Sequence, residues 1–170
     1  MTRVEDHHQG MRAALDEARQ ALEAGEFPVG CVITHRGRIV GRGHRLNSRS
    51  GSEIDHAEVV TARSALLDPA CPEPAEMIVY STMEPCLMCY ATLLLSGFRT
   101  FVYGYEDIMG GGTGLDLGSL PPLYREMPVT VVGGVLRSDC LALFQRFFGS
   151  EHNDYWRDSL LARHTLAQKP

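Results

Sequence analysis

The sequence predicts an α/β fold in which helices cover the faces of a partly parallel sheet. Two short β-type runs form a hairpin, and after residue 55 helical and strand-like segments alternate. Such alternation is typical of a parallel sheet with covered faces, here joined to an antiparallel hairpin. Before the hairpin, apolar residues recur at helical spacing and a glycine ends the helix: Met11, Leu15, Ala18, Leu22 and Gly25.

The hairpin is predicted over residues 29–34 and 38–43, with its turn near Arg36-Gly37. The next helix is predicted over residues 55–67, and three prolines break the chain after it. The remaining segments are predicted as strand 77–81, helix 86–96, strand 98–103, strand 129–132 and helix 139–148.

Length and composition predict a single domain over residues 1–170. Hydrophobic residues make up 44% and charged residues 22%, which are ordinary globular values. No stretch is long and apolar enough to cross a bilayer, so no membrane partner is expected. The N-terminus has no apolar signal core. Because the cysteine pair described below must be reduced to bind metal, the expected location is cytoplasmic.

Two short motifs carry the chemistry of the chain. His56-Ala57-Glu58 supplies an imidazole and a carboxylate, and Pro85-Cys86-Leu87-Met88-Cys89 supplies two thiols three residues apart. One imidazole and two thiolates leave a fourth position of a zinc ion open for water, which separates a catalytic site from a closed structural one. The metal lowers the pKa of that water to about 7. Glu58, which is not needed as a ligand, can shuttle protons to a leaving amine.

The spacing predicts that each motif lies at the start of a helix. Residues three apart share a helix face, so Cys86 and Cys89 can bind one ion if a helix starts at Pro85. Asp55 is the predicted N-cap of the helix that carries His56. The positive ends of two helix dipoles would then favour thiolate over thiol.

Other uses of these residues agree less well with the sequence. A structural zinc ribbon needs a second closely spaced Cys/His pair, whereas Cys31, Cys71 and Cys140 stand alone and are predicted to be buried small hydrophobes. A redox Cys-x-x-Cys pair would not account for His-x-Glu. The sequence therefore predicts one catalytic Zn²⁺ ion per chain.

A glycine-rich segment interrupts the alternation of helices and strands: Gly110-Gly111-Gly112-Thr113-Gly114. It lacks the Lys-Ser/Thr pair and the spacing of phosphate-binding loops. We predict a flexible loop near the substrate mouth, with disorder without function as the alternative.

With these motifs the chain resembles the cytidine-deaminase-like superfamily, and within it the bacterial tRNA adenosine deaminases and fungal cytosine deaminases. The resemblance runs from about residue 11 to residue 158 and includes Phe27-Pro28-Val29-Gly30, Gly41-Arg42-Gly43 and Met83-Glu84-Pro85 before the cysteine pair. It implies a three-layer α-β-α fold with a mixed five-stranded sheet, usually in a homodimer or larger assembly with sites near the subunit interface.

The same resemblance implies roles for individual residues. His56, Cys86 and Cys89 would bind zinc, and Glu58 would transfer protons while ammonia leaves the ring. Val29, Gly30 and Glu84 look like backbone positions that would border the base.

The carboxyl-terminal segment favours a small base. tRNA adenosine deaminases typically carry a basic helix there, whereas Tyr155, Trp156 and Asp158 resemble the fungal cytosine deaminase ending, which closes over the free base. Aromatic rings cover a planar base, and a carboxylate accepts from a ring N–H. Residues 153–170 are thus predicted as a helical tail that is a candidate cover for the site. In the alternative, Tyr155 and Trp156 only anchor that helix by ordinary packing.

One position departs from both families, which usually have an asparagine shortly after Gly-Arg-Gly that reads the base. Arg45 occupies that place here, and Asn47 can serve only if the loop shifts. Arg45 indicates a substrate with extra acceptors, such as a carbonyl-rich or phosphorylated ring.

Three functions follow from these observations. The first is deamination of a small free base, such as cytosine, or of a nucleoside, favoured by the net charge of -5 and by the tail. The alternative is a tRNA wobble-adenosine deaminase, favoured by the Pro-Val-Gly segment and by five arginines between Arg36 and Arg49. The third is a non-catalytic zinc-stabilised binding module, in which Glu58 would have no use.

Overall fold

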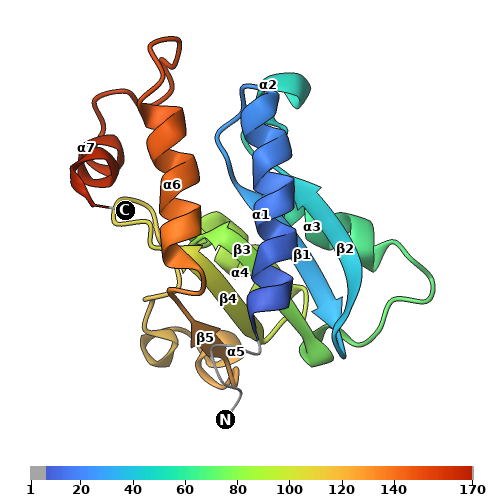
Figure 1. Cartoon of the computed structure of the whole chain (residues 1–170). Helices are drawn as coiled ribbons and strands as arrows, with labels where there is room; N and C mark the ends of the chain where they lie inside the picture. The colour runs from blue at the N-terminus through green and yellow to red at the C-terminus, as the bar shows by residue number, and fades with distance from the viewer. Residues whose placement is uncertain (1–6, 170) are drawn as a thin grey trace.

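The computed structural model describes residues 7–169, apart from the side chains of residues 48 and 49. Its centre is a five-stranded sheet in the order β2-β1-β3-β4-β5 (Figure 1). The strands are β1 (Gly30–His35), β2 (Arg38–His44), β3 (Met77–Met83), β4 (Thr100–Tyr105) and β5 (Thr130–Val132). β1 pairs antiparallel with β2 and β3, whereas β3, β4 and β5 are parallel. The predicted mixed five-stranded sheet is confirmed.

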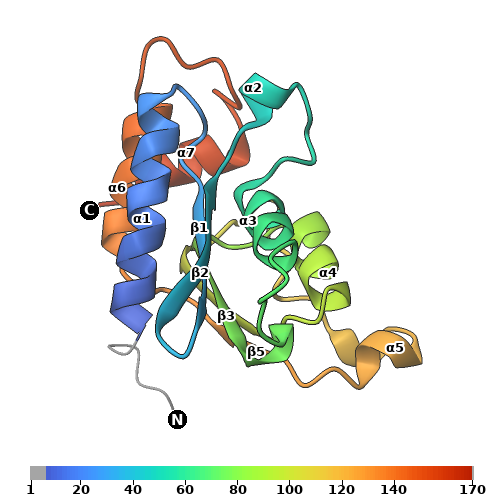
Figure 2. The same cartoon turned by 90° about the vertical axis from the view of Figure 1, so that its right-hand side faces the viewer.

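Helices cover both faces of this sheet, as Figure 2 shows edge-on. α1 (His8–Glu23) and α6 (Arg137–Phe148) lie side by side on one face, with α7 (Leu160–Ala167) packed against α6. α3 (Ala57–Leu66) and α4 (Leu87–Leu95) lie together on the other face. The predicted three-layer α-β-α arrangement is confirmed. The short helices are α2 (Asn47–Ser50), α5 (Pro122–Arg125) and the 3-10 turns Pro74–Glu76 and Leu117–Ser119.

The hairpin and the first helix form where their local sequence predicts. Arg36 and Gly37 both have left-handed φ angles, of 49° and 77°, which suit a two-residue turn between twisted strands. Gly30 allows α1 to approach β1 closely, because a Cβ there would lie 2.2 Å from the carbonyl oxygen of Ala14. The first strand and the first helix are therefore packed with no room for a side chain at this position.

The core lies between the sheet and its two helical layers. β3 and β4 are central strands whose inward side chains are almost fully buried, including Phe101. Cys31 and Cys140 are fully buried as predicted, whereas that prediction is wrong for Cys71, which is partly exposed in the loop after α3. Within residues 7–169, no helix has the length and apolar character that a membrane span requires.

Candidate metal centre and base cavity

The two motifs meet at the N-termini of α3 and α4. α4 follows the carboxyl end of β3, and α3 follows the loop after the carboxyl end of β2. Because β2 and β3 run in the same direction, both helices start beyond the same end of the strands. His56 and Cys86 are themselves the N-cap residues, with ψ angles of 152° and 168°. The predicted cap at Asp55 and helix start at Pro85 are therefore wrong: these residues precede the caps, because the two ligand residues keep an extended backbone.

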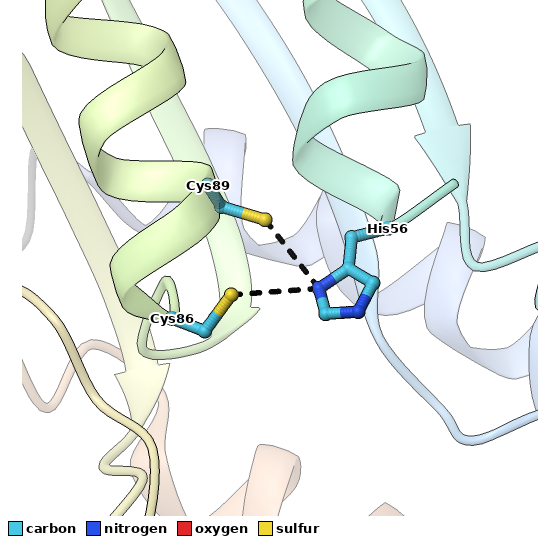
Figure 3. Close-up of side chains that lie close together, drawn as sticks. All are labelled: His56, Cys86 and Cys89. Atoms are coloured by element: carbon cyan, nitrogen blue, oxygen red, sulfur yellow. Dashed lines mark hydrogen bonds between the residues drawn. The ribbon is translucent and has the colours of Figure 1, made fainter. Parts of the chain in front are cut away.

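The side chains of His56, Cys86 and Cys89 point toward one another (Figure 3). The Nδ1 atom of His56 lies 3.6 Å from the Cys86 sulfur and 3.4 Å from the Cys89 sulfur. Tetrahedral zinc, with Zn–S bonds near 2.3 Å and Zn–N bonds near 2.0–2.1 Å, keeps such ligand atoms roughly 3.5 Å apart. The three ligand atoms lie within 4.8 Å of one another, so the group could hold one zinc ion.

The protonation of these groups suits metal binding. The pKa of Cys86 is lowered to about 4 by a hydrogen bond from Cys89, with a further contribution from His56. The pKa of Cys89 is raised, because it holds the proton shared by the two sulfurs and is buried. One thiolate is therefore already present, and a bound cation would displace the second proton.

Glu58 lies in the first turn of α3, beside the ligand group, and is only 3% exposed. The hydroxyl of Ser81, on β3, donates to its Oε1 at 2.9 Å, and its Oε2 lies 3.6 Å from the Cys89 sulfur. Burial raises the pKa of this carboxyl above its ordinary value. A carboxyl whose pKa is raised toward neutrality can take a proton and return it.

A cavity of about 140 Å³ opens beside the metal group. This is smaller than the roughly 300–1,000 Å³ of sites for drug-sized ligands, which suits a single ring system. Eight of the residues predicted for the site line it: Val29, Arg45, His56, Glu58, Glu84, Cys86, Tyr155 and Trp156. Cys89 does not line the cavity, because it is fully buried, but its sulfur lies close enough to His56 and Cys86 to bind the same zinc ion.

Three of the predicted substrate-binding residues do not line the cavity. Gly30 is buried against α1, and its N–H donates to the Thr82 hydroxyl at 3.1 Å. Asn47 donates its side-chain amide to Glu53 at 3.0 Å. Asp158 is exposed to solvent in the turn before α7. The structure therefore gives each of them surroundings other than the base cavity.

Several lining residues lay outside the predicted set. They are Phe27, Glu53, Ala57, Met83, Asp107 and Gly110. Phe27 and Met83 belong to segments that carried the family resemblance, and Gly110 begins the glycine-rich segment predicted near the mouth. Glu53 and Asp107 lie in loops whose local sequence carries no signal for the site.

Glu84 attaches the glycine-rich segment to the metal centre. Its carboxylate accepts hydrogen bonds from the N–H of Asp107 at 3.2 Å and from the N–H and hydroxyl of Thr113. The N–H of Gly112 donates to the carbonyl of Pro85 at 2.9 Å. A Cβ on Gly112 would lie 2.7 Å from the backbone of Leu87, so glycine is required where this segment crosses the start of α4.

The tail differs from the helix predicted over residues 153–170. Its helix, α7, begins only at Leu160, and residues 151–152 and 155–158 form turns. Tyr155 and Trp156 lie in these turns, stack on each other with ring centroids 5.0 Å apart, and line the cavity. Neither aromatic residue lies in a helix, so the terminal-helix alternative is wrong in that respect. That the pair covers a bound base stays a prediction.

The site combines the parts that hydrolysis of a ring amine requires. His56, Cys86 and Cys89 would hold a zinc ion, which would supply Lewis-acid activation of water at neutral pH. Glu58 can accept the proton that water loses on attacking the ring carbon and deliver it to the exocyclic nitrogen. The carbon–nitrogen bond then breaks, a carbonyl replaces the amine and ammonia leaves, so that one water is consumed for each ammonia released.

Comparison with known proteins gives a consistent family. Residues 4–105 match the family described as "Cytidine and deoxycytidylate deaminase zinc-binding region". A tRNA-specific adenosine deaminase of Streptococcus pyogenes is 32% identical over 145 residues, which cover 85% of this chain and 91% of that protein. One of Bacillus subtilis is 33% identical over 143 residues, covering 81% and 86%.

Solved structures agree in fold. A structure from a study of A-to-I editing by tRNA:A34 deaminases has a TM-score of 0.71 and 29% identity, covering 79% of this chain and 98% of that one. A guanine deaminase from Nitrosomonas europaea has a TM-score of 0.66 at 19% identity, covering 82% and 83%, and supports the fold alone. The chain belongs to the cytidine and deoxycytidylate deaminase zinc-binding family, and it is a hydrolytic deaminase that acts on a ring amine.

Proposed function

We propose that this deaminase acts on adenosine in tRNA, converting it to inosine. The observation that carries the proposal is the similarity to tRNA-specific adenosine deaminases at 32–33% identity, which extends over 86–91% of those two proteins. This puts the alternative of the sequence analysis ahead of a free base such as cytosine. An adenosine in an anticodon loop would have to leave its stack to reach the cavity, as nucleobase deaminases require.

In this proposal, each side chain near the cavity has a separate role. Glu58 moves the proton, and Ser81 fixes the carboxylate by donating to its far oxygen. Val29 and Met83 supply apolar contact for a planar ring. Arg45 lines the same cavity, where its guanidinium lies beside Glu53 and the Tyr155 hydroxyl.

A second candidate is a free base or small nucleoside, and the charge of the cavity favours it. Four carboxylates line the cavity against the single guanidinium of Arg45: Glu53, Glu58, Glu84 and Asp107. RNA phosphates near such a mouth would be repelled, whereas a neutral ring would not. The same carboxylates argue against a phosphorylated ring as substrate, which the sequence analysis considered because of Arg45.

Two of the arginines that precede the motif provide little compensation for this acidity. Arg36 lies 3.3 Å from Glu76, and Arg42 lies 3.6 Å from Glu17. Both side chains are therefore already paired, which weakens the expectation that the arginine run binds phosphate.

The deciding experiment measures ammonia release by the zinc-loaded protein with two sets of substrates. One set is an anticodon stem-loop with a wobble adenosine, also assayed for inosine; the other is cytosine, guanine, adenine and their nucleosides. We expect inosine in the stem-loop, and less of it at high salt if phosphate contacts contribute. Turnover of the small rings without inosine would replace this proposal with the second candidate.

The non-catalytic binding module is tested by Glu58→Ala. In a deaminase this variant keeps its zinc and loses turnover, whereas in a binding module it would leave every measurable function intact. The homodimer and the cytoplasmic location remain predictions. Light scattering of the purified chain tests the first, and fractionation of cells that produce it tests the second.

A further inference from the structure

Arg45 connects two walls of the cavity that are far apart in the sequence. Its Nη1 donates to the hydroxyl of Tyr155 at 2.9 Å, and its guanidinium carbon lies 4.5 Å from the centre of the Tyr155 ring. Arg45 is only 6% exposed, so both contacts are shielded from water. Two carboxylates flank its guanidinium: the buried Glu26 and the cavity-lining Glu53 each place an oxygen 3.8 Å from it.

Trp156 continues the wall that Arg45 holds. Its ring stacks on Tyr155 with an interplanar angle of 14°, and the two rings lie 5.6 Å (Tyr155) and 6.2 Å (Trp156) from the buried ring of Phe27. Trp156 also has a φ angle of +52°, a left-handed conformation that a bulky residue rarely adopts. The surrounding contacts must maintain this conformation, since the local sequence does not favour it.

The aromatic pair, Tyr155 and Trp156, lies in a segment of turns between α6 and α7. The other side-chain bonds of this segment are local, such as Arg157 to the carbonyls of Glu151 and Asn153. Contact with the base cavity therefore depends on Arg45 and on the aromatic side chains beneath the pair.

We propose that Arg45 is a specificity-determining residue that latches the aromatic pair over the cavity and so limits the size of substrate that enters. The inference rests on the proposed deaminase function. A free ring can bind beneath the closed pair, whereas a base attached to RNA brings its ribose and phosphates to the mouth and must displace Trp156. The strength of the Arg45–Tyr155 contact then sets the ratio of activity on RNA to activity on small rings.

The latch can be tested without any substrate, because Trp156 is the only tryptophan in the 170 residues. Acrylamide quenching of its fluorescence therefore reports on the aromatic pair alone. Trp156 is 42% exposed when closed, so its release should raise the quenching constant by about twofold. We expect this rise in Arg45→Ala and a smaller one in Tyr155→Phe, which keeps the ring and loses the hydroxyl.

The matched control is Arg38→Ala, which removes an exposed arginine from the same strand-and-loop region. Its quenching constant should equal that of the unmodified chain. Arg45→Ala removes the guanidinium that lies 3.8 Å from the buried Glu26 carboxylate, so this variant can fail to fold. Circular dichroism detects that failure, and Tyr155→Phe then decides the test. If Arg45→Ala folds and its quenching constant is unchanged, the latch is overturned. If Arg45→Ala does not fold, an unchanged quenching constant in Tyr155→Phe overturns it.

The activity measurement compares turnover of the anticodon stem-loop with turnover of the best small ring. Tyr155→Phe should shift this ratio toward the stem-loop by about fivefold, the effect of one lost hydrogen bond. An unchanged ratio contradicts the role in specificity. If the unmodified zinc-loaded chain turns over neither substrate, the proposed function fails, and the quenching measurement still decides whether Arg45 holds the pair.

Discussion

Replacing Glu58 by glutamine tests the proton transfer at the centre of the site. Glutamine has the size of glutamate and can still accept from the Ser81 hydroxyl, which lies 2.9 Å from Oε1. It cannot take up a proton, so general acid–base catalysis is lost. Such catalysis contributes about 10²–10⁴-fold, which corresponds to about 3–5.5 kcal/mol of activation free energy. We expect Glu58→Gln to lose turnover within this range.

The assay is ammonia release at saturating substrate, together with zinc content per chain. Ser81→Ala is the matched control, because it removes one hydrogen bond to the same carboxylate, worth about 1 kcal/mol, and should lower turnover by tenfold or less. Both variants should bind as much zinc as the unmodified chain, since neither removes a ligand. If Glu58→Gln kept more than a tenth of the turnover, Glu58 would not be the group that moves the proton.

Three further predictions concern packing, the glycine-rich segment and the metal. Gly30→Ala should lower the free energy of unfolding in urea by about 3 kcal/mol, because its Cβ meets backbone atoms of α1. Gly114→Ala, which has open space around it, should change that free energy by less than about 0.5 kcal/mol. Equal losses of stability in the two variants would contradict the close packing of α1 on β1. Glu84→Gln should weaken the hydrogen bonds that hold the glycine-rich segment and so raise KM about fivefold, with zinc content unchanged. Thr113→Val, which removes one donor to that carboxylate, should raise KM less. Loss of zinc from Glu84→Gln would refute the view that Glu84 acts only on the glycine-rich segment. After chelation Cys86, with its pKa lowered to about 4, should react with thiol reagents even at about pH 6, and added zinc should protect it; slow reaction at that pH would argue against this thiolate.

The local sequence was sufficient for the elements whose residues interact with near neighbours. The spacing of Cys86 and Cys89 predicts two ligands on one helical face, and the structure places their sulfurs within reach of the His56 ring. The hairpin turn at Arg36-Gly37 is equally local. Errors of one or two residues at the helix starts came from placing one cap at Asp55 and the other helix start at Pro85, when the ligand residues themselves hold the extended cap conformation.

The residues that surround the base were harder to predict, because their neighbours come from distant parts of the chain. Glu84 was expected to border the base through its backbone, yet its carboxylate also binds a loop more than twenty residues further on. Gly30 was expected beside Val29 in the site, yet successive residues of an extended chain face opposite sides, and α1 covers the side of Gly30. Asn47 was a candidate reader of the base and instead binds Glu53.

The sequence by itself determined the α/β architecture and brought out the candidate zinc ligands, and it predicted the carboxylate that we propose for proton transfer, since motif spacing and hydrophobic periodicity are properties of short segments. Only the tertiary structure decided that Arg45 contacts Tyr155, 110 positions away, and that Asp158 points to solvent instead of the base. The physical reason is that such contacts depend on how α6 and its following turns pack against the sheet, and no short stretch of sequence specifies that packing.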